Sequence, residues 1–254
     1  MKEETNTTAQ TKQPEDKSNS GRVVSYVPFY KDEQCQIIND DCLNCIDSLA
    51  PVDLIVTDPF YGSGGRDGSV HLNDDSIIGN RMSGDSLIWF VRAYSEKLFR
   101  VAKPDSHCYI FSDWRKYKDI QIAFETHGWE LRSLIVWDKG NGMGEFWRSS
   151  HEFILFFTKR APRKLNNGYC FNVLKYKPVR GNKYHPAEKP IDLLAFLIEA
   201  SSNENETVLD CFAGSCSTLL AAKKIGRKAI GIEIDKNYCE TGITRLSQTA
   251  MMLK

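Results

Sequence analysis

Two patterns of apolar and polar positions alternate along this chain of 254 residues. Short runs rich in Val, Ile and Phe predict buried strands, whereas apolar residues three and four apart predict amphipathic helices. The predicted strands cover residues 36–38, 52–57, 107–111, 131–137, 153–158, 207–211 and 228–234. The predicted helices cover residues 42–49, 87–101, 117–127, 190–201, 217–225 and 236–247. Their alternation predicts an α/β fold, with a mostly parallel twisted sheet and helices on both faces.

Two segments fall outside these patterns. Residues 1–20 are polar and contain no large apolar residue after Met1, so we expect a disordered tail before a single domain at 21–254. Residues 62–86 carry six glycines and few large apolar side chains, which predicts a mobile loop. Because this loop directly follows a predicted strand, we interpret it as a lid, and plain disorder is the alternative.

The composition, 41% hydrophobic and 26% charged, is that of an ordinary globular protein. No apolar run approaches the ~18 residues that a membrane span needs, and the polar N-terminus does not resemble a signal peptide. The eight cysteines are irregularly spaced, which favours reduced thiols in a cytoplasmic protein. Cys42 and Cys45 have the spacing of half a zinc site, but no second pair completes it, so we expect two helix positions and no metal.

The net charge of zero is unevenly distributed. The stretch from Lys159 to Lys189 holds nine Lys and Arg residues and one acid, Glu188, which leaves 24 basic and 32 acidic residues elsewhere. This local excess of positive charge predicts a phosphate-binding surface, and a solvated loop is the alternative.

The segment Asp58-Pro59-Phe60-Tyr61 ends the apolar run at 52–57. In open α/β sheets, ligands bind outside the carboxyl ends of the strands. The Asp58 carboxylate and the Pro59 carbonyl can accept hydrogen bonds from a flat ring that carries an amino group, and the two aromatic rings can stack on its face. A strand-end cap or turn residue is the alternative for Asp58.

A second strand–turn–helix unit begins at Thr207. Gly214 and Ser215 allow a tight turn into the next helix, whose N-terminus presents free N–H groups. Glu233 ends the following strand, where an acid can bind ribose hydroxyls, and Phe212 can pack on a ligand. The absence of Gly-Lys-Ser/Thr argues against a triphosphate-binding P-loop. The unit therefore predicts a nucleotide-like cofactor, and a purely structural turn is the alternative.

In this order, the motifs resemble the amino-directed DNA methyltransferases that use S-adenosylmethionine, in the permuted arrangement with the catalytic motif first. Asp58-Pro59-Phe60-Tyr61 is similar to their Asp-Pro-Pro-Tyr, and residues 210–218 are similar to their Asp-Pro-Phe-x-Gly-Ser-Gly-Thr-Thr. His185-Pro186-Ala187-Glu188-Lys189-Pro190 resembles their His-Pro-x-x-Lys-Pro, and residues 136–139 and 151–155 resemble family strands. The likeness covers roughly residues 35–248.

The resemblance implies methyl transfer from S-adenosylmethionine to the N6 amine of a flipped adenine in double-stranded DNA. The catalytic residues would be Asp58, Pro59, Phe60 and Tyr61, with Tyr61 stacked on the base. The cofactor-binding residues would be Asp41, His185, Lys189, Asp210, Phe212, Gly214, Ser215, Ser217 and Glu233. Glu233 would bind the ribose, and the residues of the loop, with His185 and Lys189, would surround the methionine end. Asp41 would lie near the adenine ring of the cofactor or would cap the helix that follows it, and both readings stay open.

The basic segment, at about 159–184, stands where the permuted arrangement has its target-recognition region. Its candidate DNA contacts are Lys159, Arg160, Arg163, Lys164, Lys175, Lys177 and Arg180. The resemblance also leaves open a homodimer and a companion restriction enzyme, in a bacterial or phage-encoded system.

Three positions depart from the family pattern. Phe60 replaces the second proline, Cys211 replaces a proline, and Cys216 replaces the last glycine of the cofactor turn. Cys216 is expected to add a side chain where the backbone approaches the cofactor. The alternatives are a cytosine-N4 DNA methyltransferase, a methyltransferase of RNA or protein amides, and a non-catalytic nucleic-acid-binding relative. Asp58 favours adenine because Ser is commoner there in the cytosine-N4 relatives, and the permuted order and basic segment favour DNA.

Overall fold

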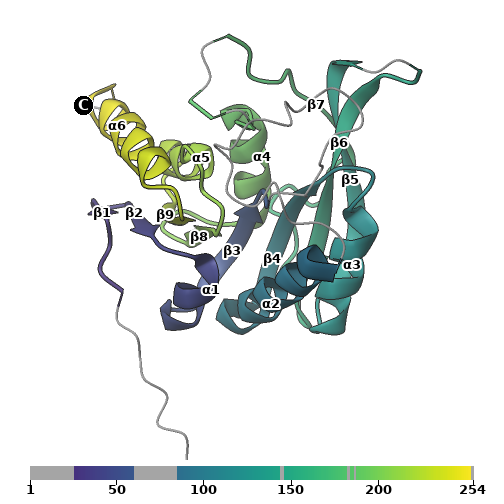
Figure 1. Ribbon diagram of the computed structural model, residues 1–254, viewed down its shortest axis with the longest axis horizontal. Coiled ribbons are helices and arrows are strands. Elements are labelled where there is room, and N and C mark those ends of the chain that lie inside the picture. The colour runs from purple at the N-terminus through teal and green to yellow at the C-terminus, as the bar shows by residue number, and fades with distance from the viewer. Residues whose placement is uncertain (1–25, 60–84, 144–145, 182–183, 186, 253–254) are drawn as a thin grey trace, which may run out of the picture.

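The computed structural model describes residues 26–59, 85–143, 146–181, 184–185 and 187–252 (Figure 1). The strands are β1 (Tyr30–Lys31), β2 (Cys35–Asn39), β3 (Val52–Thr57), β4 (Ala102–Ser112), β5 (Glu130–Met143), β6 (Ser149–Thr158), β7 (Val173–Lys175), β8 (Thr207–Asp210) and β9 (Lys228–Glu233). The helices are α1 (Cys42–Cys45), α2 (Asp85–Val101), α3 (Tyr117–Thr126), α4 (Ile191–Ser201), α5 (Ser217–Lys224) and α6 (Lys236–Met252). The predicted tail and nearly all of the predicted loop at 62–86 lie outside the described residues.

The strands form one mostly parallel sheet in the order β1-β2-β9-β8-β3-β4-β6-β5-β7. Each neighbouring pair from β2 to β4 is parallel, and β7 is parallel to β5. β1 and β6 run antiparallel to their neighbours. This topology confirms the predicted α/β fold.

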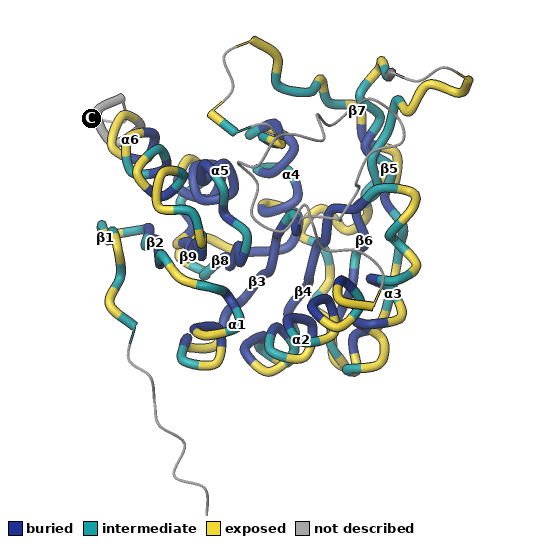
Figure 2. Tube along the Cα trace, in the orientation of Figure 1, coloured by how far each residue is buried: buried dark blue, intermediate teal, exposed yellow. Residues whose placement is uncertain are grey.

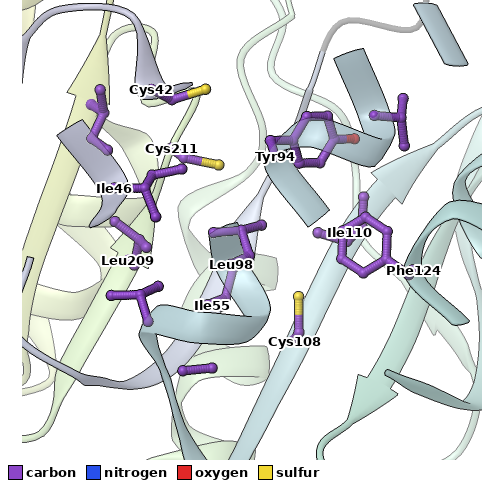
Figure 3. Packing of buried hydrophobic residues seen from close by; sticks show 14 of the residues in the cluster. Cys42, Ile46, Ile55, Tyr94, Leu98, Cys108, Ile110, Phe124, Leu209 and Cys211 are labelled. Atoms are coloured by element: carbon purple, nitrogen blue, oxygen red, sulfur yellow. The ribbon is translucent and has the colours of Figure 1, made fainter. Parts of the chain in front are cut away.

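Helices cover both faces of the sheet because each buried strand presents alternate side chains to the two sides. All six residues of β3 are buried. Ile55 belongs to the core beneath α1, α2 and α3, whereas Leu54 and Val56 face the core beneath α4, α5 and α6. The central strands appear as buried in Figure 2, and Figure 3 shows part of the first core, with Ile55, Tyr94 and Leu98 among its members.

The strands β5 and β6 extend well beyond the predicted 131–137 and 153–158. They continue as a two-stranded arm in which Asp138 pairs with His151 and Met143 with Ser149. Glycines at 140, 142 and 144 favour a turn in the sequence, but Gly140 and Gly142 lie within this arm. Gly140 has a left-handed φ of 74°, and a Cβ built on Gly142 would lie 2.3 Å from the carbonyl oxygen of Ser149. The glycines therefore permit a shift in register and a close backbone contact.

Other differences are local. The helix predicted at 42–49 is one turn of α-helix followed by a 3-10 turn at Ile46–Ser48. Cys42 and Cys45 are buried positions on α1, and burial raises the pKa of Cys45 to about 12, so this thiol stays protonated at neutral pH. The described part of the chain has no helix long and apolar enough to cross a membrane.

The order in which strands are added to the sheet changes side between the parallel strands β3 and β8. From β3 the chain proceeds through α2 to β4, whereas from β8 it proceeds through α5 to β9, on the other side. The two connecting helices cover opposite faces of the sheet. Such a topological switch point leaves a crevice at the carboxyl ends of the two strands, where α/β proteins bind ligands.

Candidate active site

Asp58 follows β3 directly and is held by Lys189. The Lys189 ammonium forms an ion pair with Asp58, and its Nζ lies 3.4 Å from Glu152 Oε2. Glu152 belongs to β6, and its other oxygen accepts a hydrogen bond of 3.2 Å from Lys139 Nζ. Lys189 Nζ also lies 5.2 Å from the centroid of the Phe111 ring. Two acids and two lysines thus alternate at the carboxyl edge of the sheet.

The charges in this cluster are mutually supporting. Burial would lower the pKa of Lys189, but Asp58 and Glu152 outweigh burial and raise it to about 12. Burial would raise the pKa of Glu152, but Lys189 and Lys139 outweigh burial and lower it. Glu152 Oε2 is buried and accepts no hydrogen bond from any described residue, so the 3.4 Å contact with Lys189 is an electrostatic one. At neutral pH a protonated lysine therefore links Asp58 to an ionised Glu152.

A hydrogen bond across the switch point joins the two candidate motifs. Thr57 Oγ1 donates to Asp210 Oδ1 at 2.6 Å, and the Phe212 N–H donates to the same oxygen at 3.1 Å. Burial raises the pKa of Asp210 to about 6, although hydrogen bonds from Thr218, Thr57 and the Phe212 N–H oppose the rise. Asp210 therefore fixes the end of β8 to the end of β3, next to Asp58.

Glu233 ends β9 and lies on the β8 side of the crevice. Its two carboxylate oxygens accept hydrogen bonds from the N–H groups of Gly214, at 2.7 Å, and Asp235, at 2.8 Å. Burial raises the pKa of Glu233. A carboxylate has about four lone-pair sites, so Glu233 keeps acceptor capacity for a ligand hydroxyl. The Gly214 turn and the acid at the end of β9 are thus held together as one unit.

The turn between β8 and α5 contains two residues with left-handed backbone, Gly214 at φ 49° and Cys216 at φ 65°. The Cys216 side chain is fully buried, and a Cβ built on Gly242 of α6 would lie 2.4 Å from its Sγ. The expectation that Cys216 adds bulk on the ligand side of the turn is therefore wrong. The thiol fills the core between α5 and α6, in space that Gly242 leaves open.

Comparison with known proteins settles the family. The family model of the N6/N4 DNA methylases matches residues 52–244. The chain belongs to this family. M.HpaI, a type II methyltransferase of Haemophilus parainfluenzae, is 33% identical over 236 residues, which span 81% of this chain and 73% of M.HpaI. The type II methyltransferase M2.LlaDCHI of Lactococcus lactis subsp. cremoris is 28% identical over 262 residues, 91% of this chain and 96% of that protein.

Solved structures of methyltransferases share the fold. The M1.HpyAVI–SAM complex is 25% identical, covers 83% of this chain and 99% of its own, and has a TM-score of 0.63. The cytosine-N4-specific PvuII DNA methyltransferase is 18% identical over 86% of this chain and 88% of its own, with a TM-score of 0.68. At that identity the PvuII enzyme supports the fold alone.

In this DNA methylase, Arg245 is a residue that the motifs did not reveal. Its guanidinium donates to the carbonyl oxygen of Ser215 at 2.7 Å, to Ser215 Oγ at 2.8 Å and to Ser217 Oγ at 3.1 Å. It also pairs with Glu188 at 2.6 Å, and both side chains of this pair are only 5% exposed. The hydroxyls of Ser215 and Ser217, which were predicted to bind the cofactor, therefore bind Arg245 and attach the loop to α6. The signal in the sequence was a charged residue on the apolar face of α6, three positions after Gly242.

Two predicted cofactor residues of this methylase, His185 beside the loop and Phe212 within it, pack against neighbouring rings. A Cβ built on Gly214 would lie 3.4 Å from the His185 ring, which packs against Tyr238 with centroids 4.4 Å apart. Phe212 packs edge-on against Phe90 and Tyr94 of α2, at 5.9 and 5.3 Å between centroids. His185 therefore adjoins the turn itself, and the partly buried Phe212 ring faces α2.

The remaining predicted residues divide into three cases. Asp41 is the N-cap of α1 and accepts a hydrogen bond of 2.9 Å from the Leu43 N–H, so the capping role is shown and its contact with adenine stays a prediction. Lys189 forms an ion pair with Asp58, the candidate catalytic acid, and its expected place at the methionine end stays a prediction. Phe60 and Tyr61 lie outside the described residues, so their stacking role stays a prediction, while Pro59 is buried.

The basic segment does not form one surface, because its candidate DNA contacts lie at two opposite edges of the sheet. Lys159 Nζ donates to the carbonyl oxygens of Phe99, at 2.6 Å, and Ala102, at 2.7 Å. Arg163 forms ion pairs with Asp105 and Glu206, at 2.9 and 2.5 Å. Asp105 and Glu206 lie near the amino ends of β4 and β8, on the edge of the sheet opposite Asp58. Lys159 and Arg163 reach this edge because they follow β6, which runs antiparallel to β4 and ends there.

The chain then crosses to the other edge. β7 pairs in parallel with Val136–Asp138 of β5, so Lys175 ends β7 on the same edge as Asp58. Lys177 and Arg180 follow and are exposed, as is Lys175. Arg160 and Lys164 are exposed too, but they adjoin Lys159 and Arg163 on the far edge.

Proposed function

We propose that this chain transfers a methyl group from S-adenosylmethionine to the exocyclic N6 amine of adenine in double-stranded DNA. The observation that carries the proposal is the meeting of two motifs at the switch point between β3 and β8. The 2.6 Å hydrogen bond from Thr57 to Asp210 joins the strand that ends in Asp58 to the strand that leads into the Gly214 turn. An acceptor for amino protons and a nucleotide-binding loop thus share one edge of the sheet.

The loop between β8 and α5 fits S-adenosylmethionine by the acceptor oxygens of Glu233 and by the glycine at its turn. Glu233 can accept hydrogen bonds from ribose hydroxyls, because each carboxylate oxygen keeps a lone pair. Gly214 has no side chain, so the backbone and His185 can approach the ligand closely. When bound, S-adenosylmethionine supplies an electrophilic methyl group on a sulfonium.

An exocyclic amine is a weak nucleophile because its lone pair is delocalised into the ring. Asp58 and Pro59 would make this amine more reactive. The Asp58 carboxylate and the Pro59 carbonyl would accept hydrogen bonds from the two N–H groups of the amine and would direct its lone pair at the methyl group. Positioning and electrostatics then supply most of the acceleration. The methylated nitrogen is strongly acidic until it loses a proton, so the weakly basic Asp58 carboxylate suffices to take that proton.

Lys189 and Glu152 position this carboxylate. Lys189 stays protonated at neutral pH because its pKa is about 12, so a positive charge lies beside the Asp58 carboxylate. Glu152 holds Lys189 from the other side, at 3.4 Å. The lysine is thus a fixed cation beside the proposed acceptor, on the nucleobase side of the crevice.

Asp58 supports adenine as the target base, because the resemblance associates an acid at this position with adenine-N6 enzymes and Ser with cytosine-N4 enzymes. A base inside a duplex cannot reach a carboxylate at a strand end, so the target has to be flipped out. The proposed DNA contacts are restricted to Lys175, Lys177 and Arg180, which lie on the catalytic edge. A homodimer and a companion restriction enzyme stay predictions.

The test is to incubate unmethylated phage DNA with methyl-labelled S-adenosylmethionine and then to digest the DNA and identify the labelled nucleoside. Wild-type protein is expected to yield N6-methyladenine, and Asp58→Ala is expected to yield none above background. Asp119→Ala is the matched control, since Asp119 is an acid on α3 that forms an ion pair of 3.4 Å with Lys116. It should label DNA at the wild-type rate.

The outcomes separate the alternatives. Label in N4-methylcytosine would correct the base assignment and would leave the site intact. Binding of S-adenosylmethionine without transfer to DNA would refute the proposed reaction. Equal transfer by Asp58→Ala and wild type would remove Asp58 from the mechanism.

A further inference from the structure

The tip of the arm formed by β5 and β6 presents two adjacent aromatic side chains to solvent. Phe146 is 93% exposed and Trp147 is 95% exposed, more than the other exposed large hydrophobic side chains of the described residues. Burial of such rings is worth about 1.5–3 kcal/mol each, so neighbouring aromatic side chains in water indicate a surface that acquires a partner. Arg148 follows them directly.

The arm rises from the catalytic edge of the sheet. At its base Trp137 pairs with Glu152, the residue that contacts Lys189, which in turn contacts Asp58. Beyond the pair of Asp138 with His151, the arm continues to the pair of Met143 with Ser149, which is two residues along β6. Phe146 is five residues from His151, so the tip stands at most about 16 Å beyond the base of the arm. Figure 1 shows the arm projecting past the strand ends, on the side toward which β3 points. The tip therefore stands beside any substrate that reaches Asp58.

The surroundings of the arm carry positive charge. Lys175, Lys177 and Arg180 leave β7, which pairs with β5 at the base of the arm. The sequence between Lys159 and Ala187 contains no acid. On the same edge, Trp114 is half exposed after the end of β4, and the Arg115 guanidinium lies 5.8 Å from its ring. Exposed aromatic rings among cations suit nucleic acid, since phosphates pair with the cations and bases stack on the rings.

The dimensions also suit a duplex. The major groove of DNA is about 12 Å wide and 8.5 Å deep and admits a two-stranded β-ribbon. A tip that reaches up to about 16 Å beyond the pair of Asp138 with His151 can span that depth from the sheet edge. The close backbone contact at Gly142 and the paired strands hold the arm as a ribbon.

We propose that Phe146 and Trp147 insert into double-stranded DNA beside the flipped nucleotide and stack on the bases that it leaves behind. The inference rests on the proposed function, because only an extruded base creates that gap. Extrusion breaks two stacking contacts, and apolar side chains that wedge between base steps compensate for such losses. The arm is thus the element that stabilises the open duplex, while Lys175, Lys177 and Arg180 bind the phosphates of the DNA.

The test compares wild type, Trp147→Phe, Trp147→Ala and Phe146→Ala/Trp147→Ala with Tyr169→Ala as the matched control. Tyr169 is 80% exposed, but it lies near the end of α4 on the opposite edge, where Asn166 donates to the carbonyl oxygen of Glu199. Affinity for a fluorescein-labelled duplex is measured by anisotropy at several salt concentrations, and methyl transfer is measured on phage DNA. Sedimentation velocity gives the oligomeric state of each variant.

The double variant is expected to bind duplex DNA roughly 5- to 150-fold more weakly, the range for loss of aromatic–base stacking. Its salt dependence should keep the wild-type slope, because no phosphate contact is removed. Trp147→Phe should retain most of the affinity, and Tyr169→Ala should match wild type. DNA should also quench the tryptophan fluorescence of wild type more than that of Trp147→Phe.

Failure of the inference and failure of the proposed function give different results. If wild type methylates DNA and the double variant binds and methylates equally well, the inference is overturned and the function stands. If wild type binds DNA without methylating it, the proposed function fails, and a loss of binding in the double variant still supports the arm as a DNA contact. A change in sedimentation without a change in DNA affinity would make the tip a contact between two copies of the chain and would overturn the inference.

Discussion

Removal of the Lys189 charge should destabilise the protein and slow methyl transfer. In Lys189→Met the unbranched stem is kept and the ammonium is lost. The Lys189 side chain is 9% exposed, and the side chains of its partners Asp58 and Glu152 are 19% and 23% exposed. The change therefore leaves two carboxylates facing each other in a largely water-excluded space.

The magnitude follows from the geometry. At 3.4 Å and an effective dielectric constant of about 20, the attraction between Lys189 and Glu152 is about 5 kcal/mol before desolvation. Removal of one partner from a buried ion pair typically costs about 3–5 kcal/mol. Glu152 keeps its 3.2 Å hydrogen bond from Lys139, and water can reach Asp58, so we expect the lower end, about 3 kcal/mol. For a chain of this size that corresponds to a fall in Tm of roughly 6–12 °C.

The assay is thermal and urea unfolding at pH 7.5 of wild type, Lys189→Met, Glu152→Gln and the double variant. Glu152→Gln removes one of the orphaned carboxylates, so in the Lys189→Met background it should restore stability, with a coupling energy of about 1–2 kcal/mol. A Tm for Lys189→Met within about 1 °C of wild type would refute the reasoning. Additive single changes would show that the 3.4 Å contact carries no free energy.

Three further predictions concern the loop and the DNA surface. The folded pKa of Asp210, about 6, lies above its ordinary value of 3.8, so its stability contribution is full below pH 3.8 and is lost as the pH rises through 6. The free energy of unfolding of wild type relative to Asp210→Asn should therefore fall by up to about 3 kcal/mol between pH 4 and pH 7, and a constant difference in urea unfolding would contradict this cause. Arg245→Ala leaves the buried Glu188 without its cation, so we expect a loss of about 3–5 kcal/mol and weaker S-adenosylmethionine binding by calorimetry, whereas an unchanged Tm would show that the pair is dispensable. Lys177→Ala should reduce the salt slope of DNA binding by about 1, and Lys164→Ala, on the far edge, should leave it unchanged; equal effects would refute the division of the basic segment.

Local patterns in the sequence predicted the elements well, because strands and helices depend on nearby residues. The buried run at 52–57 and the turn at Gly214 lie where the apolar pattern and the glycine indicated. Their meeting at one crevice followed from the general rule that ligands bind at carboxyl strand ends. The switch point between β3 and β8 brings the ends of these two segments together.

Partners distant in sequence could not be predicted in this way. Arg163 reads as a basic residue in a basic segment, but Asp105 and Glu206, which neutralise it, stand 58 and 43 positions away. Lys189 reads as part of a cofactor motif, yet its contact with Asp58 spans 131 positions. Whether a charge is free for DNA or engaged within the protein depends on the topology of the sheet, which charge counts along the chain do not contain.

The hydrogen bond between Thr57 and Asp210 also shows that the site needs two strands that are synthesised at different times. It joins residues 153 positions apart, on two strands that are neighbours at the middle of the sheet. Domains fold as the chain is made, and pairing between distant strands waits for the later one. Until β8 leaves the ribosome, β3 has an unpaired edge on that side, a template for unwanted strand pairing. An unfinished chain thus carries Asp58 beside an open edge, and the proposed crevice for the methyl donor forms only when the C-terminal strands are added.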